Sequence, residues 1–505
     1  MCFYCRMNQL GASGLTRACR RKSLTAGAFA LVGLIVAGGN VRFVAQAKDS
    51  VTYSEDVAPI VFAKCATCHR PGEAAPFSLL TYDDLKRRGT LVAAAVTSRV
   101  MPPWKAVAGD YAFKGDRRLS DAEIDTLTRW VSGGMLEGDP AKMPATPAFT
   151  PGWQLGPPDL VASMSEPFEV PAGGRDIYRN FVVPLNLTED RWVRAVDFRP
   201  SARSVVHHSL FFLDGTGTAR AQDAKDPRVG FPGEMGGFAG ARGQLMRMLM
   251  GGNLGGRPAA TSDMSDESRF VGTLGGWALG ANARALPEGL AFFLPKGADL
   301  VLSTHFHPSG KPEKEASTVG LYFAKEPPTQ AFAGLALPPL FGVFEGIEIP
   351  AGEKEYTIHD SFIVPVDVKA FNTGGHAHYL AKRMKLTATF PDGTAKTLLR
   401  IDDWDFAWQD QYPFENFVLL PKGTRLDGSI TYDNSPENPR NPSHPPARVG
   451  WGEQSTDEMG SVGVLVVAAR EEDFTILQQR YAEHVRQAAL TRPGLRRLMQ
   501  QRPLP

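Results

Sequence analysis

Six of the ten histidines in this 505-residue chain fall into three short clusters, which a random distribution rarely produces. The clusters are His207-His208, His305-Phe306-His307 and His376-Ala377-His378. Imidazole is a common protein ligand for transition metals, so clustered histidines indicate metal binding. A single pair of this kind could equally be two surface histidines on an edge strand. The metal interpretation therefore depends on the three clusters occurring together.

The third cluster lies in the segment from Val366 to Leu399, which should position it. This segment is rich in β-forming residues and is closed by the turn sequence Pro391-Asp392-Gly393, so we expect the cluster to lie on a strand. Side chains two residues apart leave the same face of a strand, so His376 and His378 can bind one ion from a single strand. If Met459 joins them, a thioether among imidazoles favours copper, particularly Cu(I).

The other two clusters can form a second site. Adjacent side chains point to opposite faces of a regular strand, so His207 and His208 can share an ion only at a strand end or a β-bulge. A third imidazole can come from His305, on the predicted strand Asp299–His305. Three imidazoles suit copper, zinc, iron or nickel and do not choose among them. We expect His307 to support the site or to lie on the surface, although it could also be a ligand.

Upstream of these clusters, Cys65-Ala66-Thr67-Cys68-His69 is C-x-x-C-H, the attachment sequence of c-type haem. Both thiols would add to the porphyrin vinyl groups, and His69 would be the proximal iron ligand. A redox disulfide or half of a zinc site would not need the histidine. Met101, in a proline-stiffened loop, is the expected second iron ligand and would raise the potential. Met135 and Met143 are alternatives, and Met101 could instead only pack.

The N-terminus predicts export. Basic residues at 17–22 precede an apolar run, Leu24–Val36, that is too short to span a bilayer, and Ala45-Gln46-Ala47 offers a small-x-small cleavage site. We therefore expect residues 1–47 to be a signal peptide, or alternatively an uncleaved anchor, and the protein to be periplasmic or exported. Three of the five cysteines lie inside this segment, so the haem motif would use every thiol of the mature chain, leaving none for disulfides.

Composition limits the remaining possibilities. The length indicates about three domains, and 43% hydrophobic with 22% charged residues is ordinary for a globular protein. A net charge of +1 without a long basic run makes nucleic acid an unexpected partner. No segment after the signal is long and apolar enough to cross a membrane. The 51 glycines and 39 prolines favour β-architecture with many turns.

The periodicity predicts several domains. A short helix from Ser54 to Cys65 and a capped helix from Leu119 through Trp130 suit a small all-α cytochrome c domain at 48–140. After a Pro- and Gly-rich linker at 141–169, short β-runs predict two antiparallel β-sandwich domains, at 170–350 and 351–470. A C-terminal helix and tail should follow at 471–505, with Phe474, Leu477, Tyr481 and Val485 on one helical face. The predicted strands are Tyr178–Val183, Trp192–Phe198, His208–Leu213, Asp299–His305, Ser317–Phe323 and Val366–Phe371. Gly215–Ser268 is expected to be a long insertion loop, within which Gln244–Met250 could form a helical turn or a lid.

Four stretches occur in the order seen in the copper type II, ascorbate-dependent monooxygenases, the family of peptidylglycine α-hydroxylating monooxygenase and dopamine β-monooxygenase. They are Val205–Phe212, Leu302–Pro308, His376–Leu380 and Ser455–Met459. The chain resembles this family over residues 170–470, and residues 48–140 resemble small bacterial cytochrome c domains. The resemblance implies two copper ions on two tandem jelly-roll-like sandwiches. Its motifs would place the electron-donating copper on His207, His208 and His305, and the reactive copper on His376, His378 and Met459.

The resemblance also implies a reaction. One oxygen atom of O2 is inserted into a C–H bond of a small organic substrate, the other leaves as water, and two electrons arrive from outside. The family places a solvent-filled cleft between its copper sites. Here the fused haem c would replace ascorbate and take electrons from a periplasmic donor protein. Gly374 stands where the peptide-processing enzyme has a carboxylate-binding arginine, and Ser461 and Gly463 also differ from it, so a peptidylglycine substrate is not expected. A non-catalytic copper-binding or electron-transfer protein, and a copper–haem dehydrogenase with haem as electron acceptor, are the alternatives.

Overall fold

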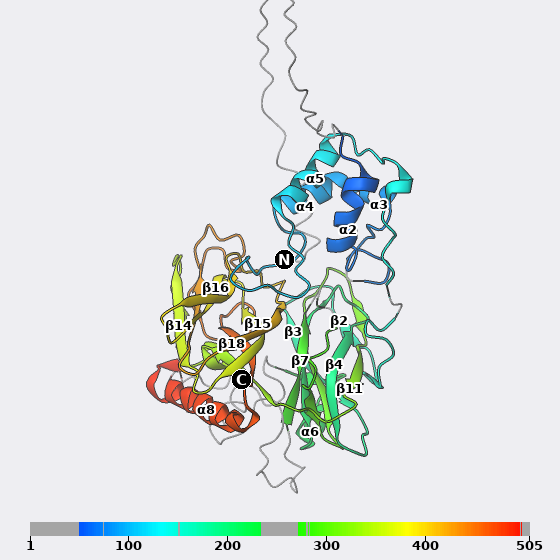
Figure 1. Cartoon of the computed structure of the whole chain (residues 1–505). Helices are drawn as coiled ribbons and strands as arrows, with labels where there is room; N and C mark the ends of the chain where they lie inside the picture. Colours follow the sequence, from blue (N-terminus) through cyan, green and yellow to red (C-terminus); the bar gives the residue numbers. More distant parts are fainter. Residues whose placement is uncertain are drawn as a thin grey trace, which may run out of the picture. The chain divides into compact units, whose positions relative to one another are not determined.

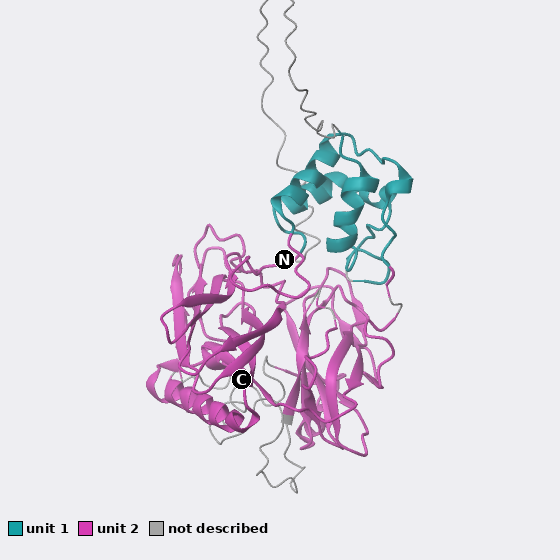
Figure 2. Cartoon of the chain, viewed as in Figure 1, with its two compact units in different colours: residues 1–102, 119–147 teal, residues 103–118, 148–505 magenta. Residues whose placement is uncertain are grey.

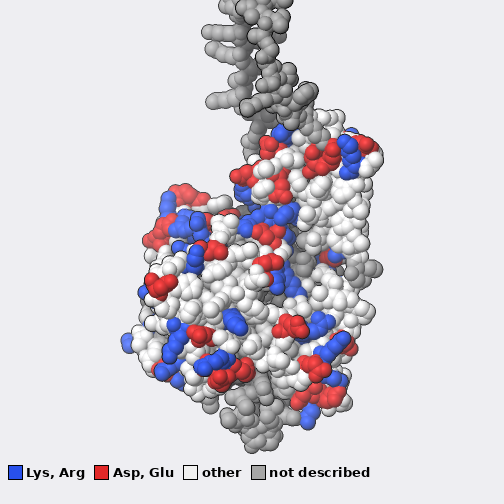
Figure 3. All heavy atoms as spheres, viewed as in Figure 1, with Lys and Arg blue, Asp and Glu red and all other residues white. Residues whose placement is uncertain are grey.

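Antiparallel β-sheet dominates the computed structural model of the chain (Figure 1). The structure describes residues 50–73, 75–149, 152–233, 271–278, 281, 283–494 and 496. The expected signal peptide, residues 1–47, lies outside this range. Among the described residues, no helix combines the length and the hydropathy that crossing a membrane requires. Positively charged side chains (lysine and arginine) and negatively charged ones (aspartate and glutamate) are both distributed over the face shown in Figure 3.

The chain forms two compact units (Figure 2). Unit 1 comprises residues 1–102 and 119–147, and unit 2 comprises residues 103–118 and 148–505. The predicted boundaries therefore need correction. Residues 103–118 lie inside the segment expected to form the first domain, but they pack with unit 2. The first strands of unit 2 also begin inside the expected linker at 141–169, so the sheet region starts earlier than predicted.

The named elements in the described part of unit 1 are all helical. They are η1 (Tyr53–Val57), α2 (Ala58–Lys64), α3 (Tyr82–Lys86), α4 (Gly89–Thr97), α5 (Asp121–Ser132) and η2 (Pro140–Lys142). The helix α5 begins where its capping sequence predicts. Its N-cap hydroxyl, on Ser120, accepts from the Glu123 N–H at 3.2 Å, and the Glu123 carboxylate accepts from the Ser120 N–H at 2.7 Å. Its apolar face buries Leu127 and Trp130 in the core of unit 1.

Two sheets share a core in the first sheet domain of unit 2. The five-stranded sheet has the order β6 (Phe231–Pro232), β3 (Ile177–Pro184), β9 (Asp299–Phe306), β5 (Val206–Asp214) and β7 (Val271–Ala278). The four-stranded sheet has the order β1 (Leu160–Ser163), β11 (Thr318–Phe323), β4 (Arg191–Arg199) and β8 (Phe292–Leu294), and β2 (Phe168–Val170) pairs with β10 (Glu313–Glu315). Phe198 of one sheet meets Phe211 of the other, with ring centroids 5.3 Å apart. This packing is consistent with a β-sandwich.

The second sheet domain repeats this arrangement. One four-stranded sheet has the order β12 (Phe332–Leu337), β21 (Gly460–Ala468), β15 (Val368–Ala377) and β18 (Gln411–Leu420). The other has the order β14 (Tyr356–Ile363), β19 (Arg425–Tyr432), β16 (Ala381–Thr389) and β17 (Ala395–Ile401). The short strands β13 (Glu348–Ile349) and β20 (Val449–Gly450) pair beside them. Strand β12 pairs with β21 although it precedes residue 351, so this domain also begins earlier than predicted.

Residues 103–118 complete the core of the second sheet domain. The Trp104 ring packs edge-to-face on Tyr412, with centroids 5.1 Å apart, and Phe113 stacks on Phe414 at 5.5 Å. Main-chain hydrogen bonds also join this segment to β17 and β18. The segment thus acts as part of the second sheet domain, inserted in the sequence between α4 and α5.

The C-terminal helix matches its prediction. After η5 (Glu471–Asp473), α8 (Phe474–Thr491) buries the four predicted side chains. The Tyr481 hydroxyl accepts from the Ala336 N–H and donates to the Ala336 carbonyl oxygen. In the expected insertion Gly215–Ser268, the structure describes α6 (Thr218–Asp223) and β6, whereas residues 234–270, including Gln244–Met250, lie outside the described residues.

Candidate metal centres

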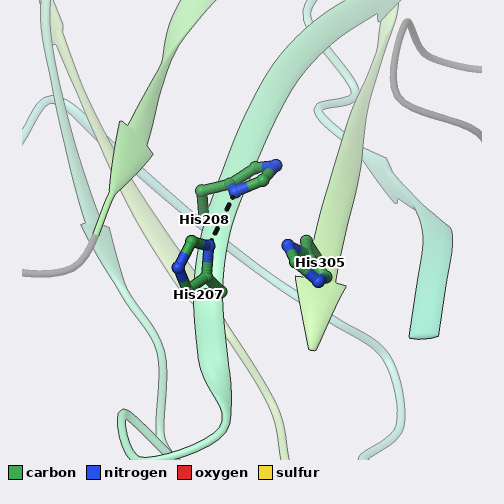
Figure 4. A group of neighbouring side chains, drawn as sticks. All are labelled: His207, His208 and His305. Carbon is green, nitrogen blue, oxygen red and sulfur yellow. Dashed lines mark hydrogen bonds between the residues drawn. The ribbon is translucent and has the colours of Figure 1, made fainter. Parts of the chain in front are cut away.

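Three imidazoles converge on neighbouring strands of the first sheet domain (Figure 4). His207 and His208 lie on β5, and His305 lies on the adjacent strand β9. One nitrogen of each ring lies within 4.8 Å of the others. The pairing of β5 with β9 shifts register between Val206 and His208, which is the β-bulge that adjacent histidines need to face one point. The predicted bulge and convergence are confirmed, and the ligand role remains a prediction.

Hydrogen bonds determine which nitrogens of this group are free. His305 Nε2 lies 2.9 Å from an oxygen of Asp176, so Nε2–H donates to the carboxylate and Nδ1 keeps its lone pair. That Nδ1 atom is buried and has no hydrogen-bond partner among the described residues. The Nδ1 atoms of His207 and His208 lie 3.1 Å apart and face each other. A buried nitrogen left unpaired is unfavourable, and a metal ion would satisfy it, so these residues fit a three-nitrogen metal site.

Burial keeps these imidazoles neutral. His208 and His305 are 7% and 1% exposed, and His207 is partly exposed. Burial, reinforced by repulsion from neighbouring imidazoles, holds the pKa of His207 and His208 well below its ordinary value. Burial also lowers the pKa of His305, although the Asp176 carboxylate opposes this. Neutral imidazole is the form that binds metals, so the group is prepared for a ligand role near neutral pH.

A second pair of imidazoles lies at the end of β15. His376 is on the strand and His378 follows its last residue, with ring centroids 5.4 Å apart. His376 Nδ1 is 2.5 Å from the side-chain oxygen of Gln409, and His378 Nδ1 is 3.1 Å from the carbonyl oxygen of Asp457. Both Nδ1–H groups therefore donate, and both Nε2 atoms keep lone pairs. These two Nε2 atoms are buried and unpartnered among the described residues, so this pair also fits a metal ion.

Met459 lies beside this pair. Its side chain is buried, and the residue immediately precedes β21. Strand pairing places Ala377 opposite Gly460. Met459 and His378 are the next residues beyond this last pair, so we expect their side chains to share a face, as opposite residues of an antiparallel pair do. The backbone of Met459 thus lies at the strand end that carries the two histidines, and its role as a ligand remains a prediction.

A buried carboxylate fixes the backbone after the histidine pair. Glu458 accepts from the N–H groups of His378 at 3.1 Å and Leu380 at 2.5 Å. Burial raises the pKa of Glu458 to about 8, although these N–H groups act in the opposite direction. Its contacts assign Glu458 a structural role.

An aromatic ring contacts both histidine groups. The buried Phe406 ring stacks on His207 with centroids 4.7 Å apart, and its centroid lies 5.4 Å from that of His378. Because one ring contacts both, the His207 and His378 imidazoles are separated by no more than the thickness of this contact, and the two histidine groups are neighbours. The resemblance implies a solvent-filled cleft between the copper sites, but here an aromatic ring fills the space between these two imidazoles.

The haem motif follows α2 in unit 1. Cys65 and Cys68 form no disulfide with each other and are of intermediate exposure, and the His69 N–H donates to the Cys65 carbonyl oxygen at 2.9 Å. His69 Nδ1 lies 3.1 Å from the carbonyl oxygen of Phe77, so Nε2 keeps the lone pair that an iron ligand needs. The donor set therefore fits a covalently attached haem.

The three candidate methionine ligands lie in different environments. Met101 is partly exposed, just before the chain leaves unit 1. Met135 packs against the core of unit 1, and Met143 is 40% exposed. Met101 stays the predicted second ligand, because Met135 already has a packing role.

Sequence reasoning did not find the residues that orient the imidazoles. Asp176 binds His305 and also His307, whose Nδ1 lies 2.8 Å from the other carboxylate oxygen. His307 is not one of the three converging imidazoles, but it bonds to the same Asp176 carboxylate as His305. This position matches the supporting role expected for His307. Gln409 and Phe406 come from the loop between β17 and β18. No motif surrounds these residues, and only their contacts reveal them.

The comparisons with known proteins do not identify a family. No family model and no curated protein matches the chain. The solved structures that it resembles include the VP2 subviral particle of infectious bursal disease virus, with 10% identity over 64% of this chain and 74% of that chain and a TM-score of 0.17. A structure of the Gx strain of the same virus shares 8% identity over 61% of this chain and 72% of that chain, with a TM-score of 0.16. Likeness at these TM-scores supports no conclusion about function.

Proposed function

We propose that this chain is an exported, copper-dependent monooxygenase that hydroxylates a C–H bond of a small organic substrate with O2 and receives electrons through a fused haem c. The observation that carries the proposal is the state of the imidazoles in the two groups. His305, His376 and His378 each use one ring nitrogen for a hydrogen bond and leave the other buried, with no partner in the part of the chain that the structure describes. Such oriented, neutral imidazoles are typical of metal ligands.

Two ligand sets follow from this arrangement. His207, His208 and His305 would hold one copper ion through nitrogen. His376, His378 and Met459 would hold the other, and a thioether beside imidazoles favours copper over zinc or iron. The two bound copper ions would supply one-electron redox chemistry and the activation of O2.

The protein's own residues prepare these sites. Asp176, Gln409 and the Asp457 carbonyl select the ring nitrogen that faces the ion. Phe406 excludes water from the space between His207 and His378, which lowers the local dielectric constant. Ligands fixed in advance need little rearrangement when the ion changes its oxidation state.

In unit 1, Cys65 and Cys68 would anchor the haem, and His69 would ligate its iron with the Phe77 carbonyl holding the ring. Met101 would be the second iron ligand, and a periplasmic protein would be the electron donor.

A small substrate without a peptidylglycine carboxylate suits this chain. Gly374 occupies the position of the carboxylate-binding arginine, and the Gln411 side chain fills the space where a Cβ on Gly374 would lie. An arginine could not be placed here without moving Gln411. The carboxylate contact of the peptide-processing enzyme is therefore missing at this position.

Oxygen consumption by the copper- and haem-loaded protein tests the proposal across a panel of small C–H substrates. We expect substrate-dependent uptake with one atom of 18O2 in the product, abolished in His378→Ala. His359→Ala is the matched control, because His359 is exposed on β14 and should leave uptake unchanged. Copper loading without substrate-dependent uptake would indicate a copper-binding or electron-transfer protein. Substrate oxidation that reduces the haem without O2 would indicate a dehydrogenase.

A further inference from the structure

A path of hydrogen bonds, joined by the short backbone stretch from Ser455 to Asp457, runs from one histidine group to the other. It begins at His305 Nε2, which donates to Asp176 Oδ2 at 2.9 Å. The same carboxylate oxygen accepts from the Ser455 hydroxyl at 2.6 Å. Asp176 precedes β3 in the first sheet domain, whereas Ser455 lies just before β21 in the second. One oxygen atom is thus shared between a residue of the first metal group and a residue of the other sheet domain.

The path continues through a tight turn. The Asp457 N–H donates to the Gln454 carbonyl oxygen at 2.9 Å, and the Gln454 N–H donates to the Asp457 carboxylate at 3.3 Å. Ser455 lies within this closed turn and is 6% exposed. The Asp457 carbonyl oxygen then accepts from His378 Nδ1 at 3.1 Å. The path therefore combines three side-chain hydrogen bonds with the backbone of one hydrogen-bonded turn.

We propose that this path couples the two metal sites, so that filling the group of His207, His208 and His305 changes the copper affinity of the group of His376, His378 and Met459. The proposal rests on the proposed copper sites but not on oxygenase activity. A cation on His305 Nδ1 withdraws charge from the ring and strengthens the Nε2–H bond to Asp176. Asp176 Oδ2 accepts from both His305 and Ser455, so a stronger bond to His305 weakens its bond to Ser455. The position of Ser455 then shifts, and with it the turn whose Asp457 carbonyl orients His378. Thermodynamic linkage requires the reverse effect to have the same size.

The shielding of the path supports this coupling. The side chains of His305 and Asp176 are 1% and 12% exposed, so solvent screens their interaction only weakly. A charge-assisted hydrogen bond in such surroundings is stronger than one on the surface. Phe406 offers a competing route, because its ring touches both His207 and His378. The test must separate the two routes.

A double-mutant cycle on the full chain makes this separation. Copper affinity of the second site is measured by chelator competition with the first site intact or emptied by His208→Ala, in wild-type, Ser455→Ala and Phe406→Leu backgrounds. We expect the first site to change the second-site Kd by about 5-fold or more in the wild type. The change should largely vanish in Ser455→Ala and persist in Phe406→Leu. The Cu(II) EPR signal of the second site should respond to His208→Ala in the same pattern.

Further variants guard the interpretation. If His208→Ala does not fold, judged by circular dichroism, His207→Ala empties the first site instead. Asp176→Asn should abolish the coupling and lower first-site affinity by about 10- to 100-fold. Asp197→Asn is the matched control, since Asp197 is a buried carboxylate of the same sheet domain bonded to Gln154, and it should change neither affinity.

Several outcomes would overturn the coupling. The first is a second-site Kd that stays the same when the first site is emptied in the wild-type background. The second is coupling that survives Ser455→Ala, and the third is coupling that is lost in Phe406→Leu but not in Ser455→Ala. Failure of both sites to bind copper would instead refute the proposed function, whereas two loaded but independent sites would refute this inference alone.

Discussion

The side-chain oxygen of Gln409 lies 2.5 Å from Nδ1 of His376, and this contact decides which nitrogen of His376 can meet a metal ion. The Gln409 amide is itself held, because its NH2 group donates to the Phe406 carbonyl oxygen at 3.1 Å. The amide oxygen therefore faces the imidazole and accepts Nδ1–H. Burial lowers the pKa of His376 to about 4, so the ring is neutral and Nε2 is available.

Replacing Gln409 by leucine should weaken the second site. Gln409→Leu removes the acceptor for Nδ1–H and frees the ring to rotate or change tautomer. We expect copper affinity at this site to fall by about 10- to 100-fold, with the first site unaffected. Chelator competition measures both sites. Gln411→Leu is the control, because the Gln411 side chain accepts from Asn372 whereas Gln409 is the acceptor for His376; equal losses in the two variants would contradict the assignment.

Copper should stabilise the fold. An ion that binds only the folded state adds about 2.7 kcal/mol to the free energy of unfolding when its free concentration is 100 times its Kd. Thermal unfolding with and without copper, followed by tryptophan fluorescence, measures this gain. The gain should be smaller in His208→Ala and in His378→Ala, and smallest in the double variant. An identical gain in the double variant would show that copper binds elsewhere.

The segment 103–118 should be needed for the stability of the second sheet domain. Trp104 is 8% exposed and packs on Tyr412, so Trp104→Ala should lower the free energy of unfolding by about 3–5 kcal/mol. Urea unfolding measures the loss. Phe417→Ala is the control, because Phe417 is 46% exposed on β18 and should cost far less. Comparable losses would mean that the segment is not part of this core.

Acid should destabilise the protein through Asp360. This buried carboxylate binds His484 at 2.8 Å and pairs with Arg492, which also pairs with Glu345. Burial raises the pKa of the Asp360 carboxyl, but the His484 and Arg492 contacts outweigh it, and the folded pKa lies below the ordinary value. Such a group stabilises the fold above its unfolded pKa of about 3.9, and this contribution is lost as the pH falls through the lower folded pKa.

We therefore expect Asp360→Asn to be less stable at pH 7 and to lose less stability on acidification than the wild type. Urea unfolding at several pH values checks both points. Asp402→Asn, at an exposed aspartate, should follow the wild-type curve. Parallel curves for the wild type and Asp360→Asn would contradict the argument.

Elements with local signals were predictable from the sequence. The capping box of Ser120 and Glu123 located the start of α5, and the apolar face of α8 was named residue by residue. Strands β3, β4, β5, β9, β11 and β15 overlap the six predicted β-runs, and the adjacency of His207 and His208 required a strand end or a bulge, of which the structure contains the bulge. These predictions succeeded because the determining residues are neighbours in sequence.

The supporting contacts were not predictable in this way. Asp176 is 129 residues from His305, and Gln409 is 33 residues from His376. A lone aspartate or glutamine has no distinguishing pattern until the fold supplies its partner. For the same reason the sequence predicts Trp104 in the first domain, at 48–140, although its ring packs in the core of the second sheet domain.

Copper content combined with X-ray absorption spectroscopy tests the central claim most directly. We predict two copper ions per chain, falling to one in His208→Ala and to one in His378→Ala. With Cu(I), a sulfur ligand should be visible in the wild type and absent in Met459→Ala. Copper content unchanged by the histidine substitutions, or a sulfur signal that survives Met459→Ala, would contradict the claim that these two groups are copper sites.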